Sequence, residues 1–367
     1  MIASKRRMHV AAALFTAVAM FTAACSSNKS DTTLADGTTP AGASGIDYAS
    51  LSGTLNGSGS TFQKAFDEDA VAGFKEVAPG VTVNYAAGGS GKGKTDLASQ
   101  VTQWAGSDSA VKDADLPTFK GGAILYFPTV AAPVTVSYNL SGVDNLQLSP
   151  ATLAQIFSGK VTTWDAQPIA DDNPGVTLPS TKIVPTVRSD GSGTTSAFTN
   201  YLKAAGGSDW TIEAGDKPTW PTGFATGNGN NGVAQAIQQT PGSIGYVDYS
   251  DAVASKLTFA SIKNMVGSYV APSLDGASAA LEGAKVNTNL TVNALNATGA
   301  DAYPITATTY VIIYQTQPDA GIGNALKGWV NYLLTDGQDL AAGANFAKLP
   351  SSLQQQAVTQ LSQMKIG

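Results

Sequence analysis

Apolar and polar residues alternate along most of this chain in short runs that predict strands followed by helices. Four runs of six or seven residues predict strands: VTVNYAA (81–87), VTVSYNL (134–140), KIVPTV (182–187) and YVIIYQT (310–316). Each precedes a segment with the apolar spacing of a helix, at 95–104, 149–159, 195–206 and 323–335. This alternation predicts α/β lobes with mainly parallel sheets, and the chain length favours two lobes over one.

The N-terminal residues 1–24 carry a different pattern, that of an export signal. Three basic residues at 5–7 precede the apolar run AAALFTAVAMFTAA and then Cys25. The run is too short for a transmembrane helix, and small residues precede the expected cleavage point. We interpret this as a lipoprotein signal in which Cys25 is lipidated and becomes the first residue. Thr22 stands where the usual motif has leucine.

Two alternatives for this segment stay open at this point. One is an ordinary secretory signal in which Cys25 is incidental. The other is a twin-arginine signal at Arg6 and Arg7, although Met8 to Val10 complete that motif poorly. Residues 26–47 are small, polar and punctuated by Gly and Pro, which predicts a flexible tether, and the fold is expected to begin near Tyr48.

Removal of residues 1–24 would change the chemistry available to the chain. They hold three of the 21 basic residues, none of the 27 acidic residues and the only histidine, so the net charge would fall from −6 to −9. With no histidine and no free thiol, Cys/His metal sites, Ser-His triads, thiol nucleophiles and disulfides are excluded. An acidic chain that keeps a single arginine, Arg188, also argues against nucleic acid as a partner.

Three Gly/Ser segments lie where helices could begin: GSGSTF (57–62), GGSGKGKT (88–95) and GSGTT (191–195). A helix N-terminus offers free N–H groups and the positive end of the helix dipole, and glycine lets an anion approach the backbone. Together with Arg188 beside the third loop, they predict one anion site assembled from several elements. The alternative is three ordinary tight turns.

The second loop also matches the G-x-x-x-x-G-K-[ST] pattern of a nucleotide-binding P-loop at Gly88, Gly93, Lys94 and Thr95. We reject that interpretation. An exported protein has no ATP supply, and no apolar strand ending in aspartate stands out as the magnesium-holding partner. The backbone is expected to cradle an anion, but not a nucleotide.

Asp108, in AGSDSAV (105–111), is a carboxylate close to the expected anion site. Like charges repel, so its presence makes sense only if the ligand carries a proton. An ionised carboxylate accepts hydrogen bonds and cannot donate them, so it can bind a P–OH group but not fully deprotonated sulfate. The alternative is an aspartate that only forms a turn.

The chain resembles the phosphate-binding protein of the bacterial phosphate-specific ABC transporter from about residue 53 to the C-terminus. The resemblance rests on GSGSTF, NYAAGGSG, GSDSAV, FPTVAAPVTVSYNL, FSGKVTTWDA, VRSDGSGTTSAFTNYL, GNGNNGVAQAIQQTPGSIGYVDYS and YPITATTYVII. It implies a bilobal type II periplasmic-binding-protein fold, α/β, with two mixed sheets flanked by helices and joined by a two-strand hinge. Lobe I would comprise residues 48–130 plus 305–367, and lobe II residues 131–304.

The resemblance also implies the ligand set. The phosphate-binding residues would be Thr61, Phe62, Ser90, Asp108, Arg188, Ser192, Gly193 and Thr194. Asp190 would orient Arg188, and a planar, permanently charged guanidinium can bind two oxygens of a tetrahedral anion. Lys92 and Lys94 stand where the family is often uncharged; they either add positive potential to the cleft or form a solvated helix start, which we favour.

By this resemblance the protein captures inorganic phosphate outside the cell and delivers it to the permease and ATPase subunits of an ABC transporter. It would be a monomer, lipid-anchored to the outer face of the cell membrane, with no cofactor, no metal and no catalytic activity. Two rivals remain: an extracellular phosphatase, although no residues suited to activating water are evident, and a surface adhesin, which would need no charged cleft.

Overall fold

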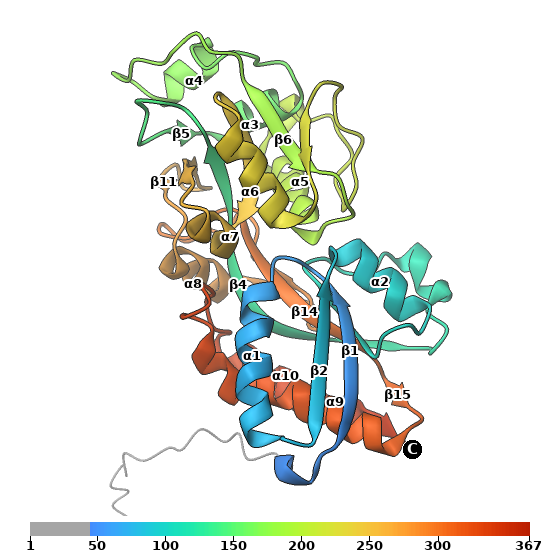
Figure 1. Ribbon diagram of the computed structural model, residues 1–367. Coiled ribbons are helices and arrows are strands. Elements are labelled where there is room, and N and C mark those ends of the chain that lie inside the picture. Colours follow the sequence, from blue (N-terminus) through green and yellow to red (C-terminus); the bar gives the residue numbers. More distant parts are fainter. Residues whose placement is uncertain (1–44) are drawn as a thin grey trace, which may run out of the picture. The chain divides into compact units, whose positions relative to one another are not determined.

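A computed structural model describes residues 45–367, whose main feature is a nine-stranded mixed sheet (Figure 1). The strand order is β2-β1-β3-β14-β4-β8-β6-β7, and β9 pairs with β4. The strands are β1 (Gly53–Gly59), β2 (Val81–Ala87), β3 (Trp104–Ser107), β4 (Ile124–Tyr138), β6 (Val184–Arg188), β7 (Ala225–Gly227), β8 (Ser243–Asp248), β9 (Thr258–Phe259) and β14 (Thr306–Tyr314).

Helices flank this sheet, and short strands pair outside it. The helices are α1 (Lys64–Val77), α2 (Ser90–Ala98), α3 (Pro150–Phe157), α4 (Gln167–Asp172), α5 (Gly193–Ala205), α6 (Gly229–Gln239), α7 (Tyr249–Ala254), α8 (Leu274–Glu282), α9 (Ala320–Leu334) and α10 (Ser351–Gln360). The short strands are β5 (Gln147–Leu148), β10 (Ser261–Lys263), β11 (Tyr269–Val270), β12 (Lys285–Val286), β13 (Val292–Asn293), β15 (Thr316–Gln317) and β16 (Lys365–Ile366).

The sheet has two parallel halves with antiparallel strands between them. β1 pairs in parallel with β2 and β3, and β6 pairs in parallel with β7 and β8. The long strands β4 and β14 pair antiparallel with each other, and β4 also pairs antiparallel with β8. We call the elements around β1 to β3 the β1 half and those around β6 to β8 the β6 half. The predicted α/β architecture is confirmed, but the two predicted sheets are one, because β4 pairs with both β14 and β8.

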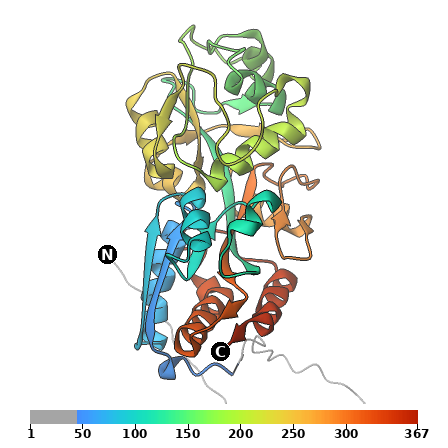
Figure 2. The ribbon, with the colours of Figure 1, turned by 90° about the vertical axis from the view of Figure 1, so that its right-hand side faces the viewer.

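Successive residues of the central strands face two separate apolar layers. In β3, Trp104 packs with the aromatic core of α1 and α9, whereas Ala105 packs on the opposite face with Leu97 of α2. Figure 2 shows α9 and α10 side by side at the C-terminal end of the chain. A strand whose residues are buried on both faces reads as an almost continuous apolar run, which is why β14 was recognisable from sequence.

The predicted strands and helices are all present, with boundaries that differ by a few residues. The largest difference is β4, which begins at Ile124, ten residues before the predicted start at Val134. The next largest is α2, which begins at Ser90 within the Gly/Ser loop rather than near Thr95. This part of α2 packs closely on β1, because a Cβ at Gly93 would lie 2.5 Å from the Ser58 carbonyl oxygen. The helix ends early as well, since Gln100 has a positive φ of 61°.

Within residues 45–367, no helix combines the length and the apolar character needed to cross a bilayer. The expected signal segment, the lipidation site Cys25 and most of the tether lie outside the described residues. Among the described residues, the first element is a short 3₁₀ helix at Tyr48–Ser50, where the fold was expected to begin.

Candidate functional site

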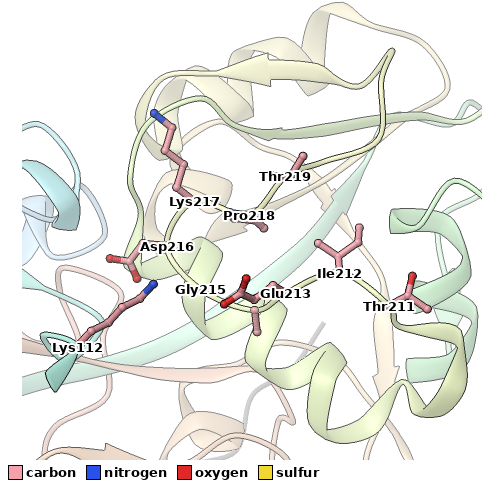
Figure 3. A pocket seen from close by; sticks show the side chains of 10 residues that line it. Lys112, Thr211, Ile212, Glu213, Gly215, Asp216, Lys217, Pro218 and Thr219 are labelled. Atoms are coloured by element: carbon pink, nitrogen blue, oxygen red, sulfur yellow. The ribbon is translucent and has the colours of Figure 1, made fainter. Parts of the chain in front are cut away.

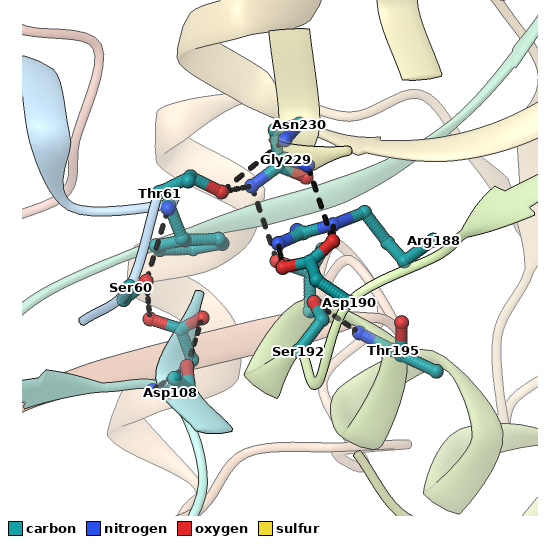
Figure 4. Close-up of polar contacts among 12 residues, drawn as sticks. Ser60, Thr61, Asp108, Arg188, Asp190, Ser192, Thr195, Gly229 and Asn230 are labelled. Carbon is teal, nitrogen blue, oxygen red and sulfur yellow. Dashed lines mark hydrogen bonds and ion pairs between the residues drawn. The ribbon is translucent and has the colours of Figure 1, made fainter. Parts of the chain in front are cut away.

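Loops from both halves of the sheet meet at the ends of their strands (Figure 4). β1, β2, β3 and β6 end at Gly59, Ala87, Ser107 and Arg188, and the predicted site residues lie at or just after these ends. Carboxyl ends of parallel strands lie at the same edge of a sheet, so side chains that follow them converge. The two halves also touch directly, because the Gly91 amide donates to the Gly191 carbonyl at 2.9 Å.

Arg188 lies at the end of β6 with its side chain almost fully buried. Asp190 holds one edge of the guanidinium, accepting from Nε at 2.8 Å and from Nη2 at 2.5 Å. The predicted orienting pair is therefore formed. Nη1 is buried and has no hydrogen-bond partner within residues 45–367, which leaves the other edge of the guanidinium available to an anion.

Asp190 is itself fixed by more than Arg188. Its Oδ1 also accepts from the Gly229 amide at 3.1 Å. Burial opposes ionisation of this carboxyl, but the hydrogen bonds and charge of Arg188 outweigh it and lower the pKa of Asp190. An ionised Asp190 neutralises much of the arginine charge, so the site is not simply a cationic pocket.

The N-terminus of α5 lies next to this arginine. Ser192 caps the helix by accepting from the Thr195 amide at 3.1 Å. Gly193 and Thr194 are the first two residues of the helix, so their amides have no intrahelical acceptor. Ser192, Gly193 and Thr194 are all buried, and the amides of Gly193 and Thr194 together with the helix dipole suit an anion.

Asp108 faces these groups from the β1 half. Its Oδ1 accepts from Ser60 at 2.5 Å and from Thr309 at 2.8 Å, and its Oδ2 accepts from Ser90 at 3.3 Å. Burial raises the pKa of Asp108 to about 6, although these hydrogen bonds and the charge of Arg188 limit the rise. A carboxyl with this pKa is mostly ionised at neutral pH and can accept a hydrogen bond from a ligand oxygen that carries a proton.

Backbone packing brings Asp108 and α5 into contact. A Cβ at Gly193 would lie 2.7 Å from both the Asp108 Cβ and the Ser90 Oγ. Only glycine fits there while the two halves are this close. Ser90 is buried and begins α2, and Gly89 before it has a φ of 91°, a conformation that glycine adopts without strain.

Thr61 and Phe62, which follow β1, lie at the same contact. The Thr61 hydroxyl accepts from the Asn230 amide at 3.2 Å and from its Nδ2 at 3.0 Å, so its own proton stays available. Phe62 is fully buried and packs edge-to-face on Phe346. Its amide donates to Ser60 Oγ at 2.9 Å, so a bound anion would have to share that donor.

The two lysines of the second loop behave differently from each other. Lys92 is half-exposed and pairs with Asp96 one turn along α2, as a solvated helix start would. Lys94 is mostly buried and forms a 2.6 Å ion pair with Asp216 of the β6 half. The favoured interpretation is wrong for Lys94, because the nearness of the 211–219 loop gives this side chain a partner across the two halves.

Sequence analysis missed several residues that complete the cluster: Ser60, Gln63, Asn230 and Thr309. Asn230 is fully buried at the start of α6, with Nδ2 also 3.2 Å from Thr194 Oγ1. The segment GNGNN (227–231) is a fourth glycine-containing loop before a helix, a signal that could have identified Asn230. Thr309 carried no such signal, because it lies inside an apolar strand.

Two open pockets lie next to the cluster of buried site residues rather than around it. One of about 370 Å³ lies between Lys112 and the 211–219 loop, and no predicted site residue lines it (Figure 3). A second, of about 790 Å³, includes Asp108 and Tyr310 among its lining residues. The candidate site is therefore the buried cluster between the halves. Among residues 45–367, no group of three His, Cys, Asp or Glu side chains could hold a metal ion.

Comparison with known proteins agrees with this fold. Residues 38–337 match the family model of the PBP superfamily domain, so the chain is a member of the periplasmic-binding-protein class. Within that class it belongs to the PstS family. It is 34% identical to the phosphate-binding protein PstS of Xylella fastidiosa over 285 residues, covering 76% of this chain and 77% of that protein.

A second relative is the phosphate-binding protein PstS 3 of Mycobacterium tuberculosis, 33% identical over 317 residues, which cover 83% of this chain and 85% of that protein. Among solved structures, a high-affinity periplasmic phosphate-binding protein (PfluDING) bound with phosphate superposes with a TM-score of 0.71. The identity is 22%, with 86% of this chain and 96% of that chain covered. This likeness confirms the predicted periplasmic-binding-protein fold.

Proposed function

We propose that this protein is the extracytoplasmic phosphate-binding component of a Pst-type ABC transporter. The observation that carries the proposal is the buried guanidinium of Arg188, whose Nη1 has no partner within residues 45–367. It lies in one cluster with the free amides of α5 and with Asp108, which comes from the other half. Relatives that share a third of the sequence are named for phosphate binding.

The bound anion would be held by Thr61, Phe62, Ser90, Asp108, Arg188, Ser192, Gly193 and Thr194. Arg188 Nη1, hydroxyl groups and helix-terminal amides would donate to the unprotonated oxygens. Asp108 would accept the proton of a P–OH group. Sulfate has no proton at neutral pH, so its oxygens would face an ionised carboxylate in a buried site, and the repulsion would exclude it.

We further propose that the halves are lobes that close over phosphate. Lobe I would comprise residues 48–130 plus 305–367, lobe II residues 131–304, and β4 and β14 would form the hinge. The closed protein would deliver its ligand to the membrane permease, which is driven by the ATPase subunits. It would act as a monomer, without cofactor or catalysis, in keeping with a family named for binding.

Lipid anchoring at Cys25 is also part of the proposal. A lipid anchor would hold the protein near its permease, and stable anchoring takes more than one acyl chain. Cys25→Ala should therefore move the protein from the membrane fraction to the medium or periplasm. If the alanine variant stays in the membrane fraction after a salt wash, the anchor lies elsewhere.

A binding titration with phosphate, arsenate and sulfate tests the proposed function. Phosphate and arsenate, which both carry a proton near neutral pH, should bind at one site, and sulfate should not compete. The same preparation should release no phosphate from a model phosphate ester. Ester hydrolysis would favour the phosphatase, and no binding of any oxyanion would favour the adhesin.

A further inference from the structure

Behind Asp108, a chain of buried polar side chains leads away from the predicted ligand. Thr309 Oγ1 lies 2.8 Å from Asp108 Oδ1 and 2.5 Å from Gln63 Oε1. Gln63 Nε2 in turn lies 2.7 Å from Asp67 Oδ2. All four side chains are buried, and Asp67 is only 1% exposed. None of Asp67, Gln63 and Thr309 belongs to the predicted ligand set.

This series of contacts needs more hydrogen-bond protons than the hydroxyl and amide groups supply, unless one of the two carboxyl groups is protonated. Thr309 has one hydroxyl proton but contacts two oxygen acceptors when Gln63 is oriented with Oε1 toward it. In that orientation Thr309 donates to Gln63, and Asp108 must carry a proton to donate to Thr309. With the carboxamide reversed, Gln63 donates to Thr309, Thr309 donates to Asp108, and Asp67 must carry the proton instead.

The surroundings of the two carboxyls decide which of them holds that proton. Asp108 also accepts from Ser60 and Ser90 and faces the charge of Arg188, which all favour its ionised form. Asp67 has only Gln63, and its Oδ1 is buried without a partner within residues 45–367. Burial raises the pKa of Asp67 to about 8, against about 6 for Asp108.

The charged groups near Asp67 also favour its protonated form. Asp108 and Glu68 are both negative and oppose a second charge on Asp67. Tyr85 of β2, which donates to the Ser60 carbonyl at 2.8 Å, stays neutral because burial raises its pKa well above 10. On α9, the titratable Tyr332 lies against Gly73, nearly two turns further along α1.

We propose that Asp67 is a protonated carboxylic acid that, through Gln63 and Thr309, positions Asp108 as a hydrogen-bond acceptor. Asp67 donates to the Gln63 carbonyl, Gln63 donates to Thr309, and Thr309 donates to Asp108. The three residues are thus specificity-determining positioning residues, because they hold Asp108 ionised and aimed at a protonated oxyanion. This inference rests on the proposed function for its ligand, but the protonation of Asp67 can be tested without one.

The ligand-free test compares the full chain with its Asp67→Asn variant. A group whose pKa is raised on folding holds a proton that the unfolded chain releases, so wild-type stability falls as pH rises from about 4 to about 8. The asparagine side chain of the variant cannot titrate. The melting temperature of the variant should therefore rise relative to wild type over that range, and a carboxylic-acid infrared band near neutral pH should disappear in it.

Asp69→Asn is the matched control, since it makes the same substitution at an exposed carboxylate of α1. It should keep the wild-type pH dependence of the melting temperature and the infrared band. If the difference in melting temperature between wild type and Asp67→Asn does not change with pH, and the band is absent, Asp67 is ionised and the proposal is wrong.

The ligand test uses Thr309→Val and Thr309→Ser. Valine removes the donor to Asp108, so phosphate affinity should fall about tenfold, the scale of one hydrogen bond to a charged group. The pH below which sulfate begins to compete should move upward, and serine should restore both properties. Wild type that binds no phosphate would instead overturn the proposed function. Wild type that binds, with an unchanged sulfate profile in Thr309→Val, would overturn the relay.

Discussion

At the scale of single residues, the site combines one cation with two carboxylates of opposite roles. Asp190 accepts hydrogen bonds from the Arg188 guanidinium, and these bonds and the arginine charge lower the pKa of Asp190. Within residues 45–367, Asp108 forms no ion pair and is held by hydroxyl groups. The first carboxylate fixes the geometry of the arginine, and under the proposed function the second would distinguish ligands that carry a proton from those that do not.

Arg188→Lys should weaken phosphate binding strongly. Lysine keeps the charge but has no planar edge, so it cannot contact Asp190 and the anion at the same time in this geometry. We expect a loss of about 2–3 kcal/mol, the scale of a charge-assisted hydrogen bond left unmade. Calorimetry measures the affinity, and the melting temperature of the ligand-free variant separates lost contacts from lost fold. Unchanged affinity would remove Arg188 from the site.

Asp108→Asn should change selectivity more than affinity. Asparagine has the same size but no charge, and its amide can donate to an unprotonated oxygen. Sulfate should therefore compete with labelled phosphate in the variant but not in wild type. The loss of phosphate affinity should be smaller than in Arg188→Lys. If sulfate competes no better in the variant, Asp108 does not control selectivity and is only a turn residue.

At the scale of elements, helix ends and strand ends do most of the positioning. Ser192 caps α5 beside Arg188, and Ser149 caps α3 by accepting from the Thr152 amide at 3.2 Å. The two caps are alike in local geometry, but only the first lies at the candidate site. They offer a direct comparison between the structural and the binding roles of a helix N-terminus.

Ser192→Ala and Ser149→Ala should separate these roles. Each removes a cap, which typically costs about 1 kcal/mol of stability. Only Ser192→Ala should also weaken phosphate binding, because it removes a proposed ligand hydroxyl and loosens the amides of α5. Chemical denaturation and calorimetry on both variants provide the measurement. Equal phosphate affinity in the two variants would make Ser192 a structural cap only.

The elements and the ligand loops could be predicted from sequence because both depend on local signals. Apolar periodicity identified β2 and α9, and glycine-containing loops next to Arg188 identified the α5 terminus. Thr309 could not be found in this way. It lies where the register of β14 against β4 shifts, and such an irregularity turns a side chain toward a new neighbour. Lys94 likewise acquired its role from a loop more than a hundred residues away.

At the scale of the whole described fold, the two halves are joined by polar contacts across the site. The Gly91 amide meets the Gly191 carbonyl, Thr61 meets Asn230, and Lys94 meets Asp216. These contacts need the halves to be close, so each would stabilise the proposed closed arrangement relative to an open one. A ligand enclosed in this way would leave only as fast as such contacts break.

Lys94→Met should accelerate phosphate release. Its ion pair with Asp216 is mostly buried, so removing it should cost the closed state about 1 kcal/mol, at the upper end for partly exposed pairs. Affinity should fall by a similar free energy, mainly through a faster dissociation rate in stopped-flow experiments.

Lys92→Met is the matched control: it removes the same charge from α2, but its partner Asp96 lies on the same helix. The control should keep the wild-type dissociation rate, and high salt should reduce the difference between wild type and Lys94→Met. If both lysine variants release phosphate equally fast, the effect comes from net charge near the cleft rather than from a contact between the halves.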